Sequence, residues 1–410
     1  MRISWRGAFG LGRNAGLLAV CQGLFTCAIS VDLTLTGLTG YQLAPQKSLA
    51  TLPFALITVA GMVTTWFAAQ LIQRIGRRAA FTLGASIGGI GGLISVSAVW
   101  HGQFWTFCLG TSAVGVFQAF AQYYRLAAAD AVSSEEKGRA VSMVLTGGVV
   151  AAILGPALAA WSKDLFAAVL FAGAYLMVAL LGFASALVIW GFYRDGESSA
   201  AQTTASGGAP SRPLGVIARQ PIFIASLANN VVGSISMMFV MTAAPLAAVA
   251  CGHSINDGAN IIQWHLVGMY APSLFAGTLI KRFGLVRMLV AGMALNLIAI
   301  QIAMGSTSLV SFYASLCALG IGWNFMFVGG TTLLSRSYHP SERARTQGLA
   351  ELLRYAATAL ATLAAGPALA GLGWSAVNGL MIPVVVLCAA MTGWWIFDQR
   401  RHASALPAAE

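Results

Sequence analysis

The chain has 410 residues, of which 58% are hydrophobic and only 9% are charged. An ordinary soluble domain carries about 25% charged residues, so the composition excludes a soluble globular enzyme and also a disordered or fibrous chain. An integral membrane protein remains. Because the apolar runs are long and unbroken rather than short and alternating, we expect membrane-spanning helices and not barrel strands.

Twelve apolar runs are long enough to cross the hydrocarbon core as helices. In chain order they cover residues 15–38, 49–72, 79–100, 104–129, 140–161, 165–193, 222–250, 258–280, 287–304, 308–334, 347–372 and 374–397. The polar break at 194–221 is rich in Ser, Ala, Gly and Thr, which predicts a flexible cytoplasmic linker. We therefore predict an all-α membrane protein with two six-helix halves, residues 1–193 and residues 222–410, the second ending in a cytoplasmic tail.

Basic residues gather in alternate polar breaks of the chain, and this sets the expected orientation. The N-terminal tail and every second break hold 19 Lys and Arg residues, whereas the breaks between them hold only Lys47 and Lys163. The positive-inside rule then places both termini in the cytoplasm and gives an even number of membrane-spanning helices. The net charge of +11 is thus an orientation signal rather than a sign of nucleic-acid binding, and contact with anionic lipid is a secondary expectation.

No sequence pattern for a metal site, a cofactor or an ATP-driven motor occurs. The six cysteines include no Cys-x-x-Cys pair, and five of them lie inside apolar runs, where a thiol behaves as a small hydrophobe. Neither a P-loop nor a His-Glu-x-x-His helix is present. We expect neither a metal nor a cofactor, and no enzymatic activity.

Short strings recur in corresponding helices of the two halves. Residues 68–76 read AAQLIQRIG and residues 276–284 read AGTLIKRFG, and each string closes the second helix of its half. GPALA occurs at 155–159 and again at 366–370, in the fifth helix of each half. Two matches at nearly the same offset indicate an internal duplication. Two six-helix halves in the same orientation are the parallel-repeat plan of one large class of transporters.

The chain resembles members of the major facilitator superfamily, most clearly in the loop between helices two and three. The family's loop usually reads Gly-x-Leu-x-Asp-Arg-x-Gly-Arg-Arg, and residues 69–78 read Ala-Gln-Leu-Ile-Gln-Arg-Ile-Gly-Arg-Arg. Gln73 replaces the Asp that joins a charge network on the cytoplasmic side in the family, so that network is expected to be weaker or built differently here. The resemblance implies gating roles for residues of both loop copies, namely Arg74, Gly76, Arg77, Gly277, Arg282 and Gly284.

Other strings resemble bacterial permeases and leave the direction of transport open. VDLT at 31–34 is similar to the Leu-Asp-x-Thr string of proton-coupled drug antiporters, and Gly155-Pro156 resembles their motif in helix five. The glycines that flank this motif are alanines here, and Gln118 stands where many antiporters carry a basic residue. The stretch MTAAPLAAVACGHS and the helix after it look like a group of bacterial permeases. Riboflavin uptake is one activity that this resemblance suggests.

Three ionisable residues in apolar runs are candidates for proton coupling, because such groups are expensive in a membrane and are usually functional. Asp32 in helix one can bind and release a proton as its exposure alternates; alternatively, it lies near the periplasmic helix end in ready contact with water. His265 in helix eight is a proton relay, a ring-stacking contact or a neutral core histidine. Glu351 lies three residues before Arg354, and this pair couples to protons, gates the pathway or is structural.

Polar residues in the predicted first, fourth, seventh and tenth helices, which line the central cavity in the family, are candidates for substrate contact. They are Gln22, Gln118, Gln122, Asn229, Asn230, Trp323 and Asn324. Amides can hydrogen-bond a neutral heteroaromatic ring, but the same groups can instead join helices to one another. Arg125 shares a helix face with two of the glutamines, and it either closes the cytoplasmic gate or snorkels to the headgroups and pairs with Asp130.

The sequence therefore predicts a twelve-helix secondary transporter that rocks two halves around a midplane site and is driven by protons. The favoured cargo is a small, partly aromatic metabolite such as a vitamin, which the cell takes up. Drug or metabolite efflux by proton antiport is the close alternative. A non-transporting membrane sensor or scaffold is the alternative from another class. We expect a monomer whose partners are the solute, protons and membrane lipids.

Overall fold

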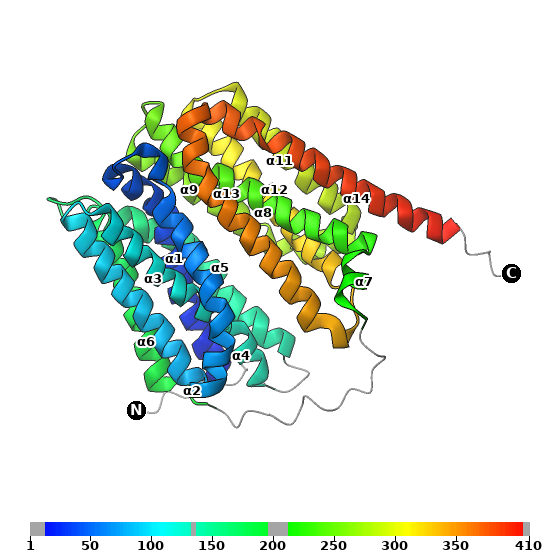
Figure 1. The fold of residues 1–410 in the computed structure, drawn as a ribbon, viewed down its shortest axis with the longest axis horizontal. Coiled ribbons are helices and arrows are strands. Elements are labelled where there is room, and N and C mark those ends of the chain that lie inside the picture. Colours follow the sequence, from blue (N-terminus) through cyan, green and yellow to red (C-terminus); the bar gives the residue numbers. More distant parts are fainter. Residues whose placement is uncertain (1–12, 133–136, 196–211, 405–410) are drawn as a thin grey trace. The chain divides into compact units, whose positions relative to one another are not determined.

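The computed structural model describes residues 13–132, 137–195 and 212–404, and these fold almost entirely into helices (Figure 1). The predicted cytoplasmic termini lie outside the described residues. The same holds for residues 196–211, which make up most of the predicted linker.

The chain divides into two compact units. Residues 1–203 with 255–263 form the first unit, and residues 204–254 with 264–410 form the second unit. The described helices of the chain up to residue 195 are α1 (Arg13–Leu43), η1 (Lys47–Leu49), α2 (Leu52–Trp100), α3 (Phe104–Ala121), α4 (Tyr124–Asp130), α5 (Lys137–Ser162) and α6 (Ala172–Phe192). Those from residue 212 onward are α7 (Leu214–Ala218), α8 (Pro221–Ala250), α9 (Ile255–Tyr270), α10 (Ser273–Phe283), α11 (Leu285–Gly305), α12 (Leu309–Leu334), η2 (Pro340–Glu342), α13 (Arg343–Gly379) and α14 (Met381–Ser404).

Eight of the described helices are long and apolar enough to cross a membrane. Two of them, Lys47–Trp100 and Arg345–Arg401, are 54 and 57 residues long, whereas one crossing takes about 20 residues. Each is interrupted by a glycine with non-helical backbone angles, Gly76 in α2 and Gly373 in α13. The prediction of an all-helical membrane protein is confirmed, and the observed helices are consistent with twelve crossings.

Two predicted runs are each divided into two helices. The run at 258–280 consists of α9 and α10, because Pro272 has no backbone N–H and disfavours helical geometry in the residue before it. The run at 104–129 consists of α3 and α4. Between them the backbone N–H of Tyr123 donates to the carbonyl of Phe120, which is a tighter turn than that of an α-helix.

Two other helices begin later than their predicted runs. α6 begins at Ala172 rather than near 165, because Phe171 before it adopts a left-handed backbone with φ of 72°. The last run, predicted at 374–397, begins as α14 only at Met381, since α13 continues to Gly379 beyond its break.

Part of the segment predicted to be a flexible linker is folded. α7 lies within residues 194–221, where the sequence pattern predicts no helix. Its Ile217 is 1% exposed and packs with Phe223 and Leu334 in a small core. A helix of five residues is too short to produce an apolar period, so the sequence pattern could not reveal it.

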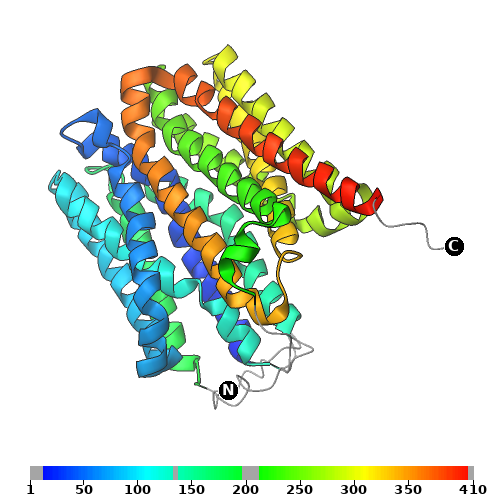
Figure 2. The same cartoon turned by 45° about the vertical axis from the view of Figure 1, so that its right-hand side comes forward.

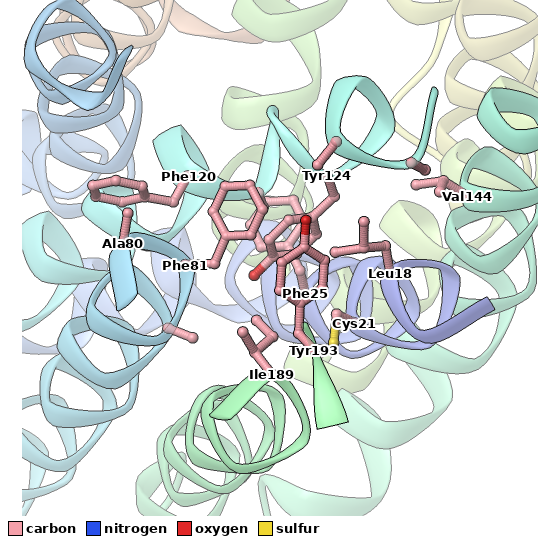
Figure 3. Close-up of a cluster of buried hydrophobic side chains, with 14 of the residues drawn as sticks. Leu18, Cys21, Phe25, Ala80, Phe81, Phe120, Tyr124, Val144, Ile189 and Tyr193 are labelled. Carbon is pink, nitrogen blue, oxygen red and sulfur yellow. The ribbon is translucent and has the colours of Figure 1, made fainter. Parts of the chain in front are cut away.

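The first unit contains a cluster of buried hydrophobic side chains, part of which Figure 3 shows. Phe81 of α2 packs edge-on against Tyr124 of α4, with 5.1 Å between the ring centroids, an arrangement that aromatic pairs favour. α2 also approaches α3 closely, because Gly84 lies against the ring of Phe120. A Cβ atom at Gly84 would lie 2.4 Å from that ring, so a larger residue would force the helices apart.

The second unit is organised around α8. Within its most apolar window 89% of α8 is buried, against 28–61% for the other seven long helices. α12, α13 and α14 all pack against it, and α11 packs against both α12 and α14 (Figure 1 and Figure 2). α8 is therefore the central helix of this unit, which explains why its polar residues meet other helices rather than lipid.

Candidate functional site

Asp32 lies in the second half of α1 and is fully buried. Its Oδ1 accepts a hydrogen bond of 3.0 Å from the hydroxyl of Thr36, one helical turn later. Its Oδ2 is buried and has no hydrogen-bond partner among the described residues. The alternative that placed Asp32 in ready contact with water therefore does not hold in this conformation. A buried polar atom without a partner is uncommon in folded proteins and calls for an explanation.

Tyr175 of α6 extends the hydrogen bonds around Asp32. Its hydroxyl lies 3.0 Å from the hydroxyl of Thr39 and 3.4 Å from that of Thr36. The ring of Phe107 packs edge-on against the Tyr175 ring, with 4.9 Å between the centroids. The sequence analysis did not identify these threonines, although their spacing of four and seven residues from Asp32 puts them on the same helix face. We call Asp32, Thr36, Thr39 and Tyr175 the Asp32 chain.

The three candidate glutamines lie in the first unit, but no hydrogen bond among the described residues joins them. Gln22 donates to the hydroxyl of Thr26 at 3.3 Å. Gln118 lies beside Gly61 of α2, and its carbonyl oxygen is buried with no partner in the described part of the chain. Gln122 follows the last residue of α3 and is half-buried. Of the three, Gln118 offers a buried acceptor that a solute could satisfy.

Asn229 and Asn230 join α8 to its neighbours. Asn229 Nδ2 donates to the hydroxyl of Thr392 in α14 at 2.9 Å. Asn230 Oδ1 accepts from the hydroxyl of Thr331 in α12 at 3.3 Å, and both amides also bond to their own helix. This is the geometry of interhelical hydrogen bonds, the second of the two roles that the sequence left open.

His265 and Asn324 form similar contacts between α12 and the helices α9 and α10. His265 Nδ1 lies 2.7 Å from the carbonyl of Leu316, and its other ring nitrogen is buried without a partner in the described residues. Asn324 donates to the carbonyl of Met269 at 2.7 Å and to the hydroxyl of Ser273. The bond from His265 to a backbone carbonyl is the arrangement expected for a neutral core histidine.

Three predicted residues meet in the second unit, where α13 approaches α12. Arg354 binds Glu351 at 2.6 Å, and its guanidinium lies 4.4 Å from the ring centroid of Tyr355 and 5.6 Å from that of Phe327. Phe327 in turn stacks on Trp323, with 4.9 Å between centroids and 13° between the planes. We call these five residues the cation–aromatic cluster. A cation over aromatic faces is stabilised by their quadrupoles, and the rings offer flat surfaces for stacking.

The cation–aromatic cluster also holds a free donor. The indole N–H of Trp323 is buried and has no hydrogen-bond partner among the described residues. The sequence analysis named Trp323, Glu351 and Arg354 but not the two other rings. The i, i+4 spacing of Trp323 and Phe327 could have identified Phe327 as a neighbour on the same face.

The first copy of the duplicated loop is held by two acidic residues from elsewhere in the first unit. Arg77 forms an ion pair of 2.5 Å with Asp130 at the end of α4. Asp195, just after α6, accepts a hydrogen bond of 3.1 Å from the backbone N–H of Arg78. Two carboxylates thus contact the loop copy in which Gln73 replaces the family's Asp. The alternative that paired Asp130 with Arg125 is wrong, because Asp130 binds Arg77 instead.

The two loop copies share one backbone conformation. Gly76 has φ of 81° and ψ of 163°, and Gly284 has φ of 87° and ψ of 152°, a region that glycine alone adopts readily. The side chains of Arg74 and Arg282 are exposed, and Arg282 lies over the ring of Phe283. Gly277 lies in α10. The matching turns support the inference of an internal duplication.

An ion pair that the sequence analysis missed ties the start of the described second unit to α13. Glu342 is buried, and its carboxylate accepts hydrogen bonds of 2.7 and 2.8 Å from the guanidinium of Arg212. The backbone N–H groups of Arg212 and His339 donate to the same carboxylate. The Arg212 guanidinium, together with these backbone donors, holds the pKa of Glu342 well below its usual range.

No group of three His, Cys, Asp or Glu side chains that could hold a metal ion occurs in the part of the chain that the structure describes.

Comparisons with known proteins agree with this architecture. A family model described as Major Facilitator Superfamily matches residues 17–269 and 231–410. The riboflavin transporter RfnT of Brucella anthropi is 38% identical over 375 residues, which cover 92% of this chain and 94% of that protein. The uncharacterised MFS-type transporter YdeG of Bacillus subtilis is 26% identical and covers 91% of both chains.

Solved structures extend the likeness to the fold. A mutant of the nucleoside transporter NupG is similar with a TM-score of 0.72 at 13% identity, covering 93% of this chain and 99% of that one. A bacterial homologue of the human lysosomal transporter Spinster, in an inward-facing and occupied conformation, has a TM-score of 0.63 at 14% identity, covering 94% and 96%. At these identities the likeness concerns the fold alone.

Proposed function

The chain belongs to the major facilitator superfamily of membrane transporters, and we propose that it imports a flat, heteroaromatic vitamin, with riboflavin as the first candidate, at the expense of a proton gradient. The expected setting is a bacterial inner membrane with both chain ends in the cytoplasm. The expected working form is a monomer.

The observation that carries the substrate proposal is the similarity to the riboflavin transporter of Brucella anthropi. At 38% identity over 92% of the chain, the two proteins are similar along their whole length rather than in the fold alone. The resemblance of the stretch at 241–254 to a group of bacterial permeases supports the same cargo.

The side chains available in each unit suit such a cargo. A flat ring system can stack on aromatic faces, and its polar edge needs both donors and acceptors. In the second unit the cation–aromatic cluster supplies stacked rings and the unpartnered indole N–H of Trp323. In the first unit Gln118 supplies a buried carbonyl oxygen without a partner in the described residues. Unsatisfied buried groups favour a ligand that satisfies them over one that does not.

The Asp32 chain supports proton coupling. An ionisable residue within a membrane-spanning helix is a functional candidate by default. Asp32 is fully buried, with one carboxylate oxygen bound to Thr36 and the other unpartnered among the described residues. His265 is the weaker candidate, because a backbone carbonyl already engages its ring. Glu351 is engaged by Arg354, so its charge is already balanced.

A growth assay tests the substrate directly. The host is a bacterium that can neither synthesise riboflavin nor import it, and it expresses the chain. We expect growth on low external riboflavin. We also expect roughly tenfold slower uptake for Trp323→Leu, since stacking on a ring typically contributes this much or more. Trp105→Leu, at a tryptophan with 65% exposure, is the control and should import normally.

The absence of growth, with the parent chain present in the membrane, would rule out riboflavin as the cargo. Equal uptake by the Trp323 and Trp105 variants would instead remove the cation–aromatic cluster from the substrate site. The two results are distinguishable, because the second still leaves riboflavin transport in place.

Efflux of drugs or metabolites is the second candidate, favoured by the VDLT string at 31–34. The same host, deprived of its own drug pumps, separates the two functions. Efflux predicts raised resistance to several unrelated compounds, whereas import predicts none.

A further inference from the structure

A cavity of about 670 Å³ opens at one end of the second unit. It lies where the turn between α10 and α11 meets the ends of α12 and α14, the last of which runs beside α11 in Figure 1. Its polar lining is Arg287, Arg336, Gln399 and Arg400, and its apolar lining includes Phe283 and Trp395. The proposed transport mechanism makes no use of it.

The lining of this cavity is strongly cationic. Three arginines from three helices or their ends converge on it, and among the described residues that line it none is acidic. Arg287 and Arg336 are exposed, and neither takes part in the ion pairs Arg77–Asp130, Lys163–Asp164, Arg212–Glu342 and Arg354–Glu351. The positive charges of Arg287 and Arg336 repel one another, so an anion between them is stabilised.

Backbone groups point to the same chemistry. α11 begins at the edge of the cavity with Gly284 as its first flanking residue, and no side chain caps it. The first N–H groups of a helix have no partner within the helix and carry a partial positive charge. An uncapped helix start is a favourable place for phosphate or carboxylate.

The duplicated turn in the first unit holds an acidic side chain at the corresponding position. At Gly76, which has the same backbone conformation as Gly284, the carboxylate of Asp195 occupies the anion position. It accepts the N–H of Arg78, and its Oδ2 lies 3.2 Å from where a Cβ of Gly76 would be. At Gly284 the corresponding space is open, with no atom within 4 Å. In the first unit the carboxylate of Asp195 thus lies beside the turn at Gly76. In the second unit no described side chain fills the matching space beside Gly284.

Two further features show what kind of anion fits. Trp395 is 3% exposed and adds a buried aromatic ring to the apolar wall of the cavity. The cavity borders a core formed by Leu285, Leu289 and Trp395, among others, and Phe283 and Phe397 nearby are about half exposed. An amphiphile with an anionic head and apolar chains matches both the cationic and the apolar surface.

We propose that this cavity binds the phosphate-bearing headgroup of an anionic phospholipid. The headgroup phosphate accepts hydrogen bonds from Arg287, Arg336 and the start of α11, in the position that Asp195 fills in the first unit. The acyl chains lie along the exposed apolar residues beside α10 and α14. The bound lipid thereby joins the turn between α10 and α11 to α14.

Lipid binding to the purified full-length chain tests this proposal. The thermal midpoint and the number of lipids retained in native mass spectrometry are measured with phosphatidylglycerol, with phosphatidylcholine and with inorganic phosphate. We expect phosphatidylglycerol to bind and to raise the midpoint. The double variant Arg287→Gln/Arg336→Gln should bind it at least about tenfold more weakly, because a hydrogen bond to a charged group typically contributes about this much.

Arg343→Gln/Arg345→Gln is the matched control, because it removes the same charge from exposed residues at the start of α13, outside the cavity. It should bind phosphatidylglycerol as the parent does. Gln399→Glu places a carboxylate in the lining, as the first unit does, and should also lose the lipid. The thermal midpoints of Gln399→Glu, Arg287→Gln and Arg336→Gln, measured in phosphatidylcholine, show whether each variant is folded.

Equal losses in both double variants would overturn the proposal, since they would mean that general surface charge attracts the lipid. Saturation by inorganic phosphate alone, with no added effect of phosphatidylglycerol, would also overturn it, because the occupant would then be a free anion. If the Gln399→Glu variant and the Arg287→Gln/Arg336→Gln variant each retain the lipid, this cavity is excluded as the binding site.

Discussion

Asp32 is the residue on which the coupling proposal depends. It is buried in α1, and only one of its two carboxylate oxygens is engaged among the described residues. A group that couples transport to protons must bind a proton in one state and release it in another, and an amide can do neither. Asparagine has nearly the same shape, so it can keep the bond to Thr36 while it removes the titration.

The first prediction follows from this. Asp32→Asn should abolish accumulation of solute against its gradient and should also abolish the proton uptake that accompanies it. Downhill exchange should persist, because it needs the binding residues but no net proton movement. A pH-sensitive dye inside proteoliposomes measures the proton flux. Asp164→Asn, at an exposed aspartate that pairs with the buried Lys163, is the control. Full proton-driven accumulation by the Asp32 variant would shift the coupling role to His265 or Glu351.

A second residue-scale prediction concerns Glu342, whose pKa is lowered mainly by Arg212. Because its pKa in the folded chain lies below the unfolded value of about 4.3, its stabilising effect is fully present above that value. The effect is lost as the pH falls through the folded pKa. Glu342→Gln should lower the thermal midpoint by a few degrees at neutral pH, and the difference from the parent should shrink below about pH 4. A constant difference down to acid pH would show that Glu342 acts through packing alone.

At the scale of elements, the breaks in the long helices were predictable where a special residue makes them. Glycine closes each duplicated string, and the structure turns at both Gly76 and Gly284. Pro272 likewise divides the predicted run at 258–280, because its own backbone restrictions end the helix before it. α7 could not be predicted, because its stability comes from burying Ile217 against residues far away in the chain.

The candidate site shows the same division between local and distant causes. Trp323 and Phe327 stack at helical spacing, so the sequence could suggest their contact. Arg77 binds Asp130, which lies 53 residues away in the chain. Thr36 lies beside Tyr175, which is 139 residues away. A single sequence carries no record of which helix packs against which, so these contacts had to come from the structure.

The third prediction concerns the duplicated turn. Alanine at Gly76 or Gly284 would have to adopt a backbone region that costs about 1–3 kcal/mol for other residues. At Gly76 the new Cβ would also lie 3.2 Å from Asp195, whereas at Gly284 it would enter open space. Gly76→Ala should therefore lower the thermal midpoint more than Gly284→Ala does. Gly348→Ala, in α13 with open space around it, is the control and should be neutral or stabilising. The reverse order would contradict the argument from Asp195.

At the scale of the whole molecule, the charge distribution predicts the orientation in the membrane. The 19 basic residues in alternate breaks, against 2 in the others, should hold one set of loops in the cytoplasm. A reporter fused after residue 205 should then be active on the cytoplasmic side. A reporter inserted beside the half-buried His253 should be active on the periplasmic side. Reversed labelling at both sites would contradict the proposed orientation.

The proposed function is the transport of riboflavin across a membrane together with protons. The most direct measurement uses the purified chain in proteoliposomes, with the outside more acidic than the inside and with labelled riboflavin outside. The account predicts that riboflavin accumulates inside above its external concentration and leaves again when a protonophore collapses the gradient. Entry no faster than into protein-free liposomes, with the folded chain present in the vesicles, would contradict it.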